Sequence, residues 1–111
     1  MIVDLRTYTL GIGAVPAFLQ RYAREGLPAQ KRHLGPPLGY YTTEVGTLSQ
    51  VVHLWQYENM ADREQRRRAL EDDAQWRAYK ARSLADGHVI RQENTILNAV
   101  NLAALGAEAD R

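Results

Sequence analysis

Strand-like and helix-like stretches alternate along this 111-residue chain in the order strand, helix, strand, strand, helix, strand. Strands are expected at positions 2–10, 38–45, 50–57 and 88–97, where apolar, aromatic and β-branched residues are dense. The stretches between them repeat apolar residues every three or four positions, as amphipathic helices do. This order predicts an α+β domain in which four antiparallel strands carry both helices on one face.

Both helical stretches contain a predicted break. Pro28 removes a backbone donor, so we expect a kink there, followed by a second helical piece that ends near Gly35. In the second stretch, Asn59 can cap a helix that runs to about position 70. Asp73 then suits a new N-terminus. The second helix is therefore expected in two pieces.

The length of the chain favours a single domain over positions 1–100, with a tail at 101–111 that has no strong periodicity. A domain of this size buries only roughly 60–70% of the surface of its unfolded chain. Helices on one face of the sheet also leave the other face bare. A second copy of the chain could cover that face, so we expect a homodimer.

Composition excludes several classes of function. The sequence has 14 basic and 13 acidic residues, a net charge of +1, which offers no field to attract nucleic acid. It has no cysteine, which excludes disulfides and thiolate chemistry and is compatible with a reducing compartment. The apolar runs are short and the N-terminus lacks the layout of a signal peptide. We expect a cytoplasmic protein that contacts neither nucleic acid nor membrane.

Several co-linear segments carry a resemblance to a known family. They are LPAQKRHLG at 27–35, GYY at 39–41, QVVHLW at 50–55, IVDLRTYTL at 2–10, DREQRR at 62–67 and QEN at 92–94. From about position 2 to 97 the chain resembles the NIPSNAP family. The resemblance implies a ferredoxin-like βαββαβ domain that forms a dimeric α/β barrel, in agreement with the order of elements above. It implies no particular reaction, and positions 102–111 depart from the family pattern.

The first and third strands are expected at the centre of the sheet, where Arg6, Tyr8 and His53 could converge. In the catalytic interpretation, His53 is a base, and Arg6 stabilises developing negative charge with Tyr8 or Tyr41. In the structural interpretation, Arg6 pairs with a nearby carboxylate and His53 fills the sheet. The assignment of faces depends on register, because a slip of one residue turns every side chain to the other side.

Other candidates are expected to contact a ligand. His33 could contact a ligand or cap the first helix beside two cations. Arg63, Arg66 and Arg67 could border a pocket mouth and attract an anionic ligand, or belong to a solvated helix face. Aromatic rings can stack on a flat ligand. The candidate ligand-binding residues are His33, Tyr41, Trp55, Tyr57, Arg63 and Trp76.

The three histidines do not form a metal motif. None of them pairs with another at helical spacing or lies beside cooperating carboxylates. We therefore expect no metal and no cofactor, although some dimeric α/β barrels bind haem through a histidine. The interpretation favoured here is a homodimer that binds a small, aromatic molecule between sheet and helices, with cofactor-independent proton transfer as its chemistry. The alternative is a non-enzymatic dimeric module for protein interaction.

Overall fold

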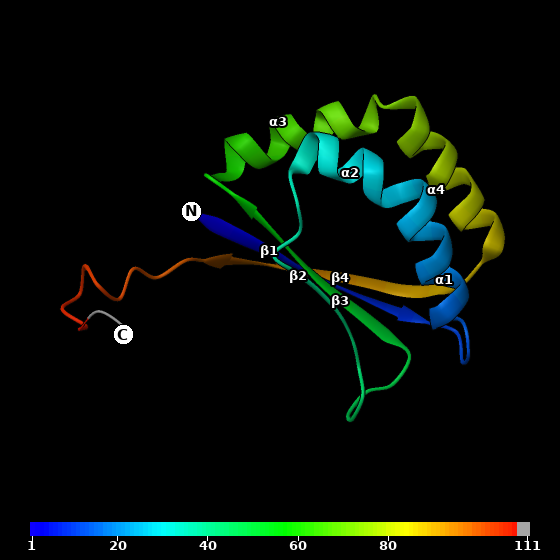
Figure 1. Ribbon diagram of the computed structural model, residues 1–111, viewed down its shortest axis with the longest axis horizontal. Coiled ribbons are helices and arrows are strands. Elements are labelled where there is room, and N and C mark those ends of the chain that lie inside the picture. Colours follow the sequence, from blue (N-terminus) through cyan, green and yellow to red (C-terminus); the bar gives the residue numbers. More distant parts are fainter. Residues whose placement is uncertain (109–111) are drawn as a thin grey trace.

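The computed structural model describes residues 1–108, and positions 109–111 of the predicted tail lie outside the described residues. Figure 1 shows a layer of helices above a sheet, with the C-terminal segment extending away from the domain. The elements are β1 (Ile2–Leu10), α1 (Val15–Arg21), the π-helical η1 (Tyr22–Gly26), α2 (Leu27–Leu34), β2 (Gly39–Thr42), β3 (Gln50–Tyr57), α3 (Met60–Glu71), α4 (Ala74–Asp86) and β4 (Val89–Asn98).

The four strands form one antiparallel sheet in the order β2-β3-β1-β4. The predicted α+β, ferredoxin-like βαββαβ fold is confirmed, with β1 and β3 at the centre. Arg6 of β1 lies directly opposite His53 of β3. Because residues directly opposite each other in an antiparallel pair point to the same face, both side chains lie on one side of the sheet.

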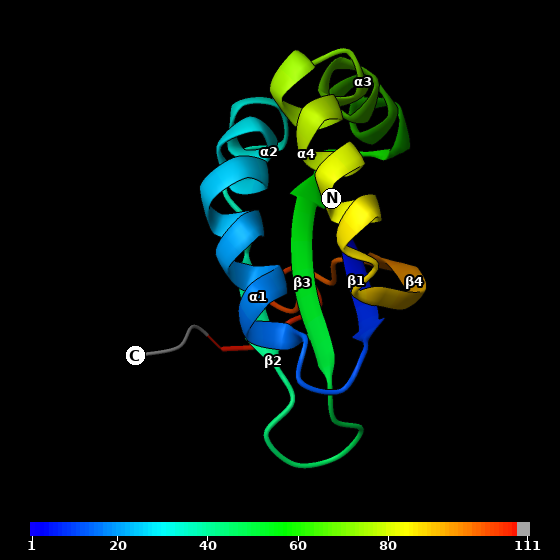
Figure 2. The same ribbon diagram turned by 90° about the vertical axis from the view of Figure 1, so that its right-hand side faces the viewer.

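The hydrophobic core lies between the sheet and the helices. Figure 2 shows that all the helices cover the same face of the sheet. Within residues 1–108, no helix covers the other face, to which β1 and β3 contribute half-buried side chains such as Leu5 and Leu54. The buried side chains of the core include Ile2, Leu10, Phe18, Tyr22, Leu34, Trp55, Tyr57, Leu70, Trp76 and Tyr79.

The first helical stretch widens where a break was predicted. The backbone N–H of Leu27 donates to the carbonyl of Tyr22, five residues earlier, and this closes a π-turn. Pro28 lies in the first turn of α2 and has no N–H, so one hydrogen bond of the helical ladder is absent there. An α-helical Pro28 would clash with the carbonyl of Arg24, and the extra residue of the π-turn provides room. The predicted break is therefore a wide turn, and the second helical piece ends at Leu34, next to the predicted Gly35.

The second strand is shorter than predicted, while the second helix breaks where expected. β2 ends at Thr42 rather than near position 45. Gly46 and Ser49 have positive φ angles, of 125° and 60°, which a strand does not allow, so positions 43–49 form a loop. Asn59 caps α3 by accepting a hydrogen bond from the N–H of Asp62, and Asp73 caps α4.

An ion-pair cluster below the helices joins α3 to the sheet. Asp4 of β1 is fully buried. Its Oδ2 accepts hydrogen bonds from Arg63 Nε at 3.0 Å and Arg6 Nη1 at 3.3 Å, and its Oδ1 accepts one from Asn94 Nδ2 at 3.4 Å. A buried carboxylate is tolerated only when it is paired and hydrogen-bonded in this way. Among residues 1–108, no helix has the length and apolar character needed to cross a membrane.

Gly26 tests whether the close packing of the π-turn matters for stability. A Cβ built on Gly26 would lie 2.9 Å from Tyr79 Cε2 and 3.0 Å from Tyr22 Cδ1. Alanine normally stabilises a helix relative to glycine by about 1 kcal/mol. Here we expect Gly26→Ala to lower the free energy of unfolding by about 1–2 kcal/mol, because overpacking outweighs propensity. Urea unfolding measures the change.

Gly11→Ala is the matched control, because a Cβ at Gly11 has no atom within 4 Å. Its free energy of unfolding should stay within about 0.5 kcal/mol of the wild type. A Gly26→Ala variant as stable as the wild type would show that the π-turn can shift to accommodate the added methyl group.

Candidate functional site

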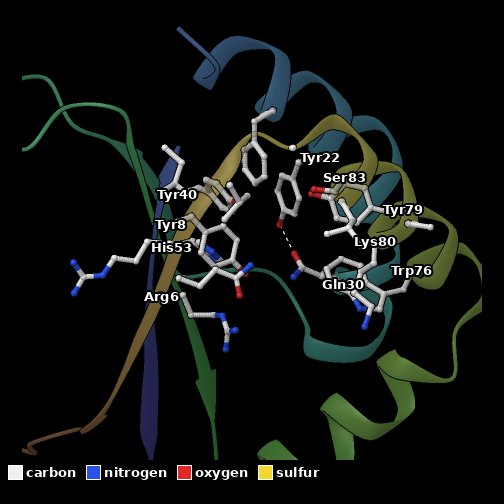
Figure 3. A pocket seen from close by; sticks show the side chains of 18 of the residues that line it. Arg6, Tyr8, Tyr22, Gln30, Tyr40, His53, Trp76, Tyr79, Lys80 and Ser83 are labelled. Carbon is white, nitrogen blue, oxygen red and sulfur yellow. Dashed lines mark hydrogen bonds between the residues drawn. The ribbon is translucent and has the colours of Figure 1, made fainter. Parts of the chain in front are cut away.

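A cavity of about 680 Å³ lies between the sheet and the helices. Figure 3 shows sheet residues such as Arg6 and His53 on one side and helix residues such as Tyr22 and Trp76 on the other. The cavity therefore belongs to the face of the sheet that the helices cover. The residues that line it include Arg6, Tyr8, Tyr22, Gln30, Tyr40, His53, Arg67, Glu71, Trp76, Tyr79 and Lys80.

Aromatic rings stack along one wall of this cavity. The ring centroids of Tyr22 and Tyr40 are 4.9 Å apart. Those of Tyr40 and His53 are 4.6 Å apart, with 16° between the ring planes. Tyr8 meets His53 edge to face, with 4.9 Å between the ring centroids. Such contacts hold flat side chains in defined orientations. The sheet supports this order, because Tyr40 of β2 lies directly opposite His53 of β3.

The π-turn places Gln30 beside Tyr22. Residues eight apart in an α-helix point roughly 80° away from each other, whereas an extra residue in between brings them back to one face. The hydroxyl of Tyr22 donates to Gln30 Oε1, and both side chains are buried. The same widening that accommodates Pro28 thus aligns two polar groups above the sheet.

His53 is held in one tautomer. Trp55 Nε1 lies 2.7 Å from His53 Nδ1. An indole N–H can only donate, so Nδ1 is the acceptor and the neutral ring carries its proton on Nε2. That Nε2 is buried and has no hydrogen-bond partner among the described residues. Burial, followed by repulsion from Arg6 and then Arg67, lowers the pKa of His53 to about 3 against the opposing effect of Asp4.

Tyr22, Tyr40 and Tyr79 stay protonated at neutral pH. Burial raises the pKa of Tyr79 to about 12. It also raises the pKa of Tyr22 and of Tyr40. Together with neutral His53, these groups present hydrogen-bond donors and aromatic faces, and they are poor bases near neutral pH.

Charged groups border the same space. The side chain of Arg6 is 16% exposed and shares Asp4 with Arg63. Arg67 reaches the cavity from α3. Glu71 also lines it but forms an ion pair with Lys80. Burial raises the pKa of Glu71, yet the contacts with Lys80 outweigh burial and leave that pKa below its usual value. The unneutralised charge near the cavity is therefore positive.

Comparison with known proteins assigns the family. The NIPSNAP family model matches residues 3–104. The chain belongs to the NIPSNAP family. A solved protein from Agrobacterium tumefaciens is 35% identical with a TM-score of 0.84, over 90% of this chain and 94% of that one. A NIPSNAP domain protein from Burkholderia xenovorans is 34% identical with a TM-score of 0.84, over 90% and 95% of the two chains.

A longer animal protein also matches this NIPSNAP domain. Protein NipSnap homolog 3B of Mus musculus is 32% identical over 74 residues, which are 66% of this chain and 29% of the mouse protein. The chain thus spans less than a third of the length of that relative. Shared family membership supports the fold.

The NIPSNAP domain brings some of the predicted site residues together and separates others. Arg6, Tyr8, His53 and Trp76 line the cavity. Tyr41 is 58% exposed, and the pairing of the adjacent Tyr40 with His53 turns Tyr41 to the open face of the sheet. The predicted residues that lie outside the cavity lining are His33, Tyr41, Trp55, Tyr57 and Arg63.

Three of these outlying residues have structural contacts. His33 Nε2 lies 2.9 Å from Asp73 Oδ2, which joins α2 to the N-cap of α4. Hydrogen bonds from Arg32 and then His33 hold the pKa of Asp73 well below its usual range. Arg63 binds Asp4 at 3.0 Å, and Trp55 lies behind His53 as its hydrogen-bond donor. Within residues 1–108, no group of three or more His, Asp or Glu side chains could hold a metal ion.

Sequence reasoning missed several lining residues. Tyr40 could have been found from strand pairing, because the register that opposes it to His53 excludes Tyr41 from the same face. Tyr79 follows Trp76 by one helical turn and shares its buried face. Tyr22 and Gln30 carry no such signal, since their alignment depends on the π-turn. Arg67 was expected with Arg63 and Arg66 at a pocket mouth, and of these three arginines it alone lines the cavity.

Acid unfolding tests the burial of neutral His53. Its pKa is about 3 in the folded chain and about 6.5 when exposed, so between these values the unfolded state binds one more proton. The stability contributed by neutral His53 is present above pH 6.5 and is lost as the pH falls toward 3. We expect the free energy of unfolding to fall by up to about 1.4 kcal/mol per pH unit between pH 6 and 4.5 from this group.

Urea titrations across this pH range compare the wild type with His53→Gln. The variant should lack this component of the slope. His88→Gln, which retains His53, is the control. Equal slopes in wild type and His53→Gln would show that His53 does not titrate abnormally.

Proposed function

We propose that this NIPSNAP chain is a homodimer that binds a small, flat molecule in the cavity between the sheet and the helices. The observation that carries the proposal is a cavity of about 680 Å³ whose lining includes three buried polar atoms without partners in residues 1–108. They are Tyr40 Oη, His53 Nε2 and Trp76 Nε1. Small-molecule sites typically have this size and combine aromatic walls with a few convergent polar groups.

The shape of the ligand follows from the aromatic lining. The rings of Tyr22, Tyr40 and His53 stack on one another. On α4, the ring centroids of Trp76 and Tyr79 lie 5.2 Å apart. Rings of this kind present flat faces, which favour planar ligands over bulky ones. An aromatic molecule therefore suits the cavity better than a branched aliphatic one.

The chemistry that suits this site is stabilisation of negative charge. His53 was predicted as a base, but its Nδ1 is occupied by Trp55 and its Nε2 carries the proton. A neutral N–H beside Arg6 can instead stabilise an enolate or carboxylate oxygen, as preorganised donors do in many active sites. This pair would then bind the oxyanion of a ligand and would not remove a proton from it.

The open face of the sheet supports the homodimer. No described helix covers it, and Leu5 of β1 lies directly opposite Leu54 of β3 there. A second copy would shield these side chains from water. The sequence has no cysteine, which agrees with a cytoplasmic location as part of the proposal.

A second candidate is a dimeric module that acts through protein contacts without catalysis. It is favoured by the segment after β4, where Val100, Leu102 and Leu105 are exposed. Exposed apolar side chains of this kind are common at protein interaction sites. Under this alternative, the cavity is a packing defect, and replacing its donors changes folding without changing any ligand affinity.

Ligand binding can be tested with the two tryptophans as reporters. A panel of aromatic acids, phenols and quinols is screened by thermal shift, because a ligand of the folded state raises the melting temperature. Hits are then titrated into ¹⁵N-labelled protein. We expect them to move the indole N–H signal of Trp76, which lines the cavity, with Trp76→Phe providing the assignment.

Neighbouring tyrosines provide a matched pair for this experiment. Tyr40→Phe removes a hydroxyl in the cavity and should weaken binding about threefold to tenfold, the loss of one hydrogen bond. Tyr41→Phe, on the opposite face of the sheet, should leave the affinity unchanged. Hits that move neither indole signal, or that respond only to Tyr41→Phe, would contradict the proposal.

Sedimentation equilibrium tests the homodimer. The wild type should sediment with twice the 12.6 kDa mass of the chain at micromolar concentration. Leu54→Arg places a charge on the open face and should give a monomer that keeps its helical circular dichroism. Gln65→Arg, on the exposed surface of α3, is the control and should remain dimeric. A folded wild-type monomer at this concentration would refute the dimer.

A further inference from the structure

We infer that the cavity selects a planar molecule with an anionic hydrogen-bond acceptor, an aromatic carboxylate or an enolate, because Trp55 holds His53 as an N–H donor. This inference rests on the proposed function and specifies its ligand class. It assigns Trp55, which does not line the cavity, as the residue that positions His53.

The first step concerns the hydrogen bond behind His53. An indole can donate through Nε1 but cannot accept, and Trp55 Nε1 lies 2.7 Å from His53 Nδ1. Trp55 is fully buried, so its N–H cannot donate to solvent water instead. The other tautomer would set two N–H groups against each other. His53 therefore presents Nε2–H on the far side of its ring.

The second step is that the free polar groups of the cavity are weighted toward donors. His53 Nε2 is buried without a partner in the described chain. Trp76 Nε1 forms no hydrogen bond of normal geometry there, but its indole can only donate, and its contact with Glu71 helps to lower the pKa of that carboxyl. Two acceptors of the lining already have partners. Gln30 Oε1 accepts from the hydroxyl of Tyr22, and Glu71 pairs with Lys80. A ligand that supplies acceptors satisfies these groups, whereas one that supplies only donors leaves them unpaired.

The third step is charge. Arg6 and Arg63 share the single carboxylate of Asp4, so two positive charges meet one negative charge and leave a net +1 beside the cavity. Arg67 lines the cavity and adds a second positive charge. The one carboxylate in the lining, Glu71, is held by Lys80. An anion is therefore favoured over a neutral acceptor, and a cation is opposed.

The aromatic walls separate this site from a simple anion site. The rings of Tyr22, Tyr40 and His53 line the cavity beside the donors, together with Trp76 and Tyr79 of α4. A small inorganic anion would satisfy the donors but not cover these rings. A carboxylate or enolate joined to an aromatic ring does both.

Three naphthalene probes of similar shape test the ligand class. They are 2-naphthoate, 2-naphthalenemethanol and 2-naphthylmethylammonium, and binding is measured by titration calorimetry and by the indole N–H signal of Trp76. We expect 2-naphthoate to bind at least about tenfold more tightly than the alcohol, and the ammonium to bind most weakly. His88→Gln, outside this cavity, is the control and should keep this order.

Trp55→Phe tests the positioning role. In the wild type, ¹⁵N spectra should show His53 protonated at Nε2 and unprotonated at Nδ1. The variant should show a mixture of tautomers, and its affinity for 2-naphthoate should fall about tenfold while that for the alcohol changes little. A merely structural tryptophan would weaken both probes equally and leave the tautomer unchanged.

The outcomes separate this inference from the proposed function. If all three probes move the Trp76 signal with equal affinity, or the ammonium binds best, the cavity binds flat molecules but the acceptor class is wrong. If Trp55→Phe keeps the Nε2–H tautomer and the preference, Trp55 does not position His53. If none of the probes binds, the cavity does not accept flat molecules, and the proposed function falls together with this inference.

Discussion

The pairing of β1 with β3 decides what this domain can do. In the observed register, Arg6 lies directly opposite His53, and Asp4 lies directly opposite Trp55. All four side chains therefore lie on the face that the helices cover. A slip of β1 by one residue would turn Asp4 and Arg6 toward the open face and bring Leu5 beneath the helices. The hydrophobic pattern alone would tolerate that exchange, so the buried charges and the aromatic core must hold the register.

The helices complete the site through a local adjustment. Pro28 favours a wide turn, and Gly26 allows that turn to approach the ring of Tyr79. The extra residue then rotates Gln30 onto the face that carries Tyr22. The same wide turn therefore accommodates Pro28 and aligns Tyr22 with Gln30. Single-turn π-helices are frequent at functional sites for this reason.

The fold and part of the site could be predicted from the sequence, because both depend on periodicity. Alternation places Arg6 and Tyr8 on one face of β1, the pairing with β3 adds His53, and all three line the cavity. The sequence did not distinguish Tyr40 from Tyr41, since a short strand constrains its own register weakly. The choice among neighbouring arginines depends on which one reaches Asp4. That contact comes from tertiary packing, which a local pattern does not encode.

Buried donors without hydrogen-bond partners reduce the stability of so small a domain unless water or a ligand pairs with them. Each buried polar group without a partner costs about 1–3 kcal/mol, a large share of the roughly 5–15 kcal/mol that keeps a domain folded. Water can relieve this cost in the empty cavity, because it both donates and accepts. A ligand that displaces the water must replace its acceptor role at His53 and Trp76. The same groups that would weaken a closed core therefore discriminate between ligands, and their selectivity depends on the tautomer that Trp55 imposes on His53.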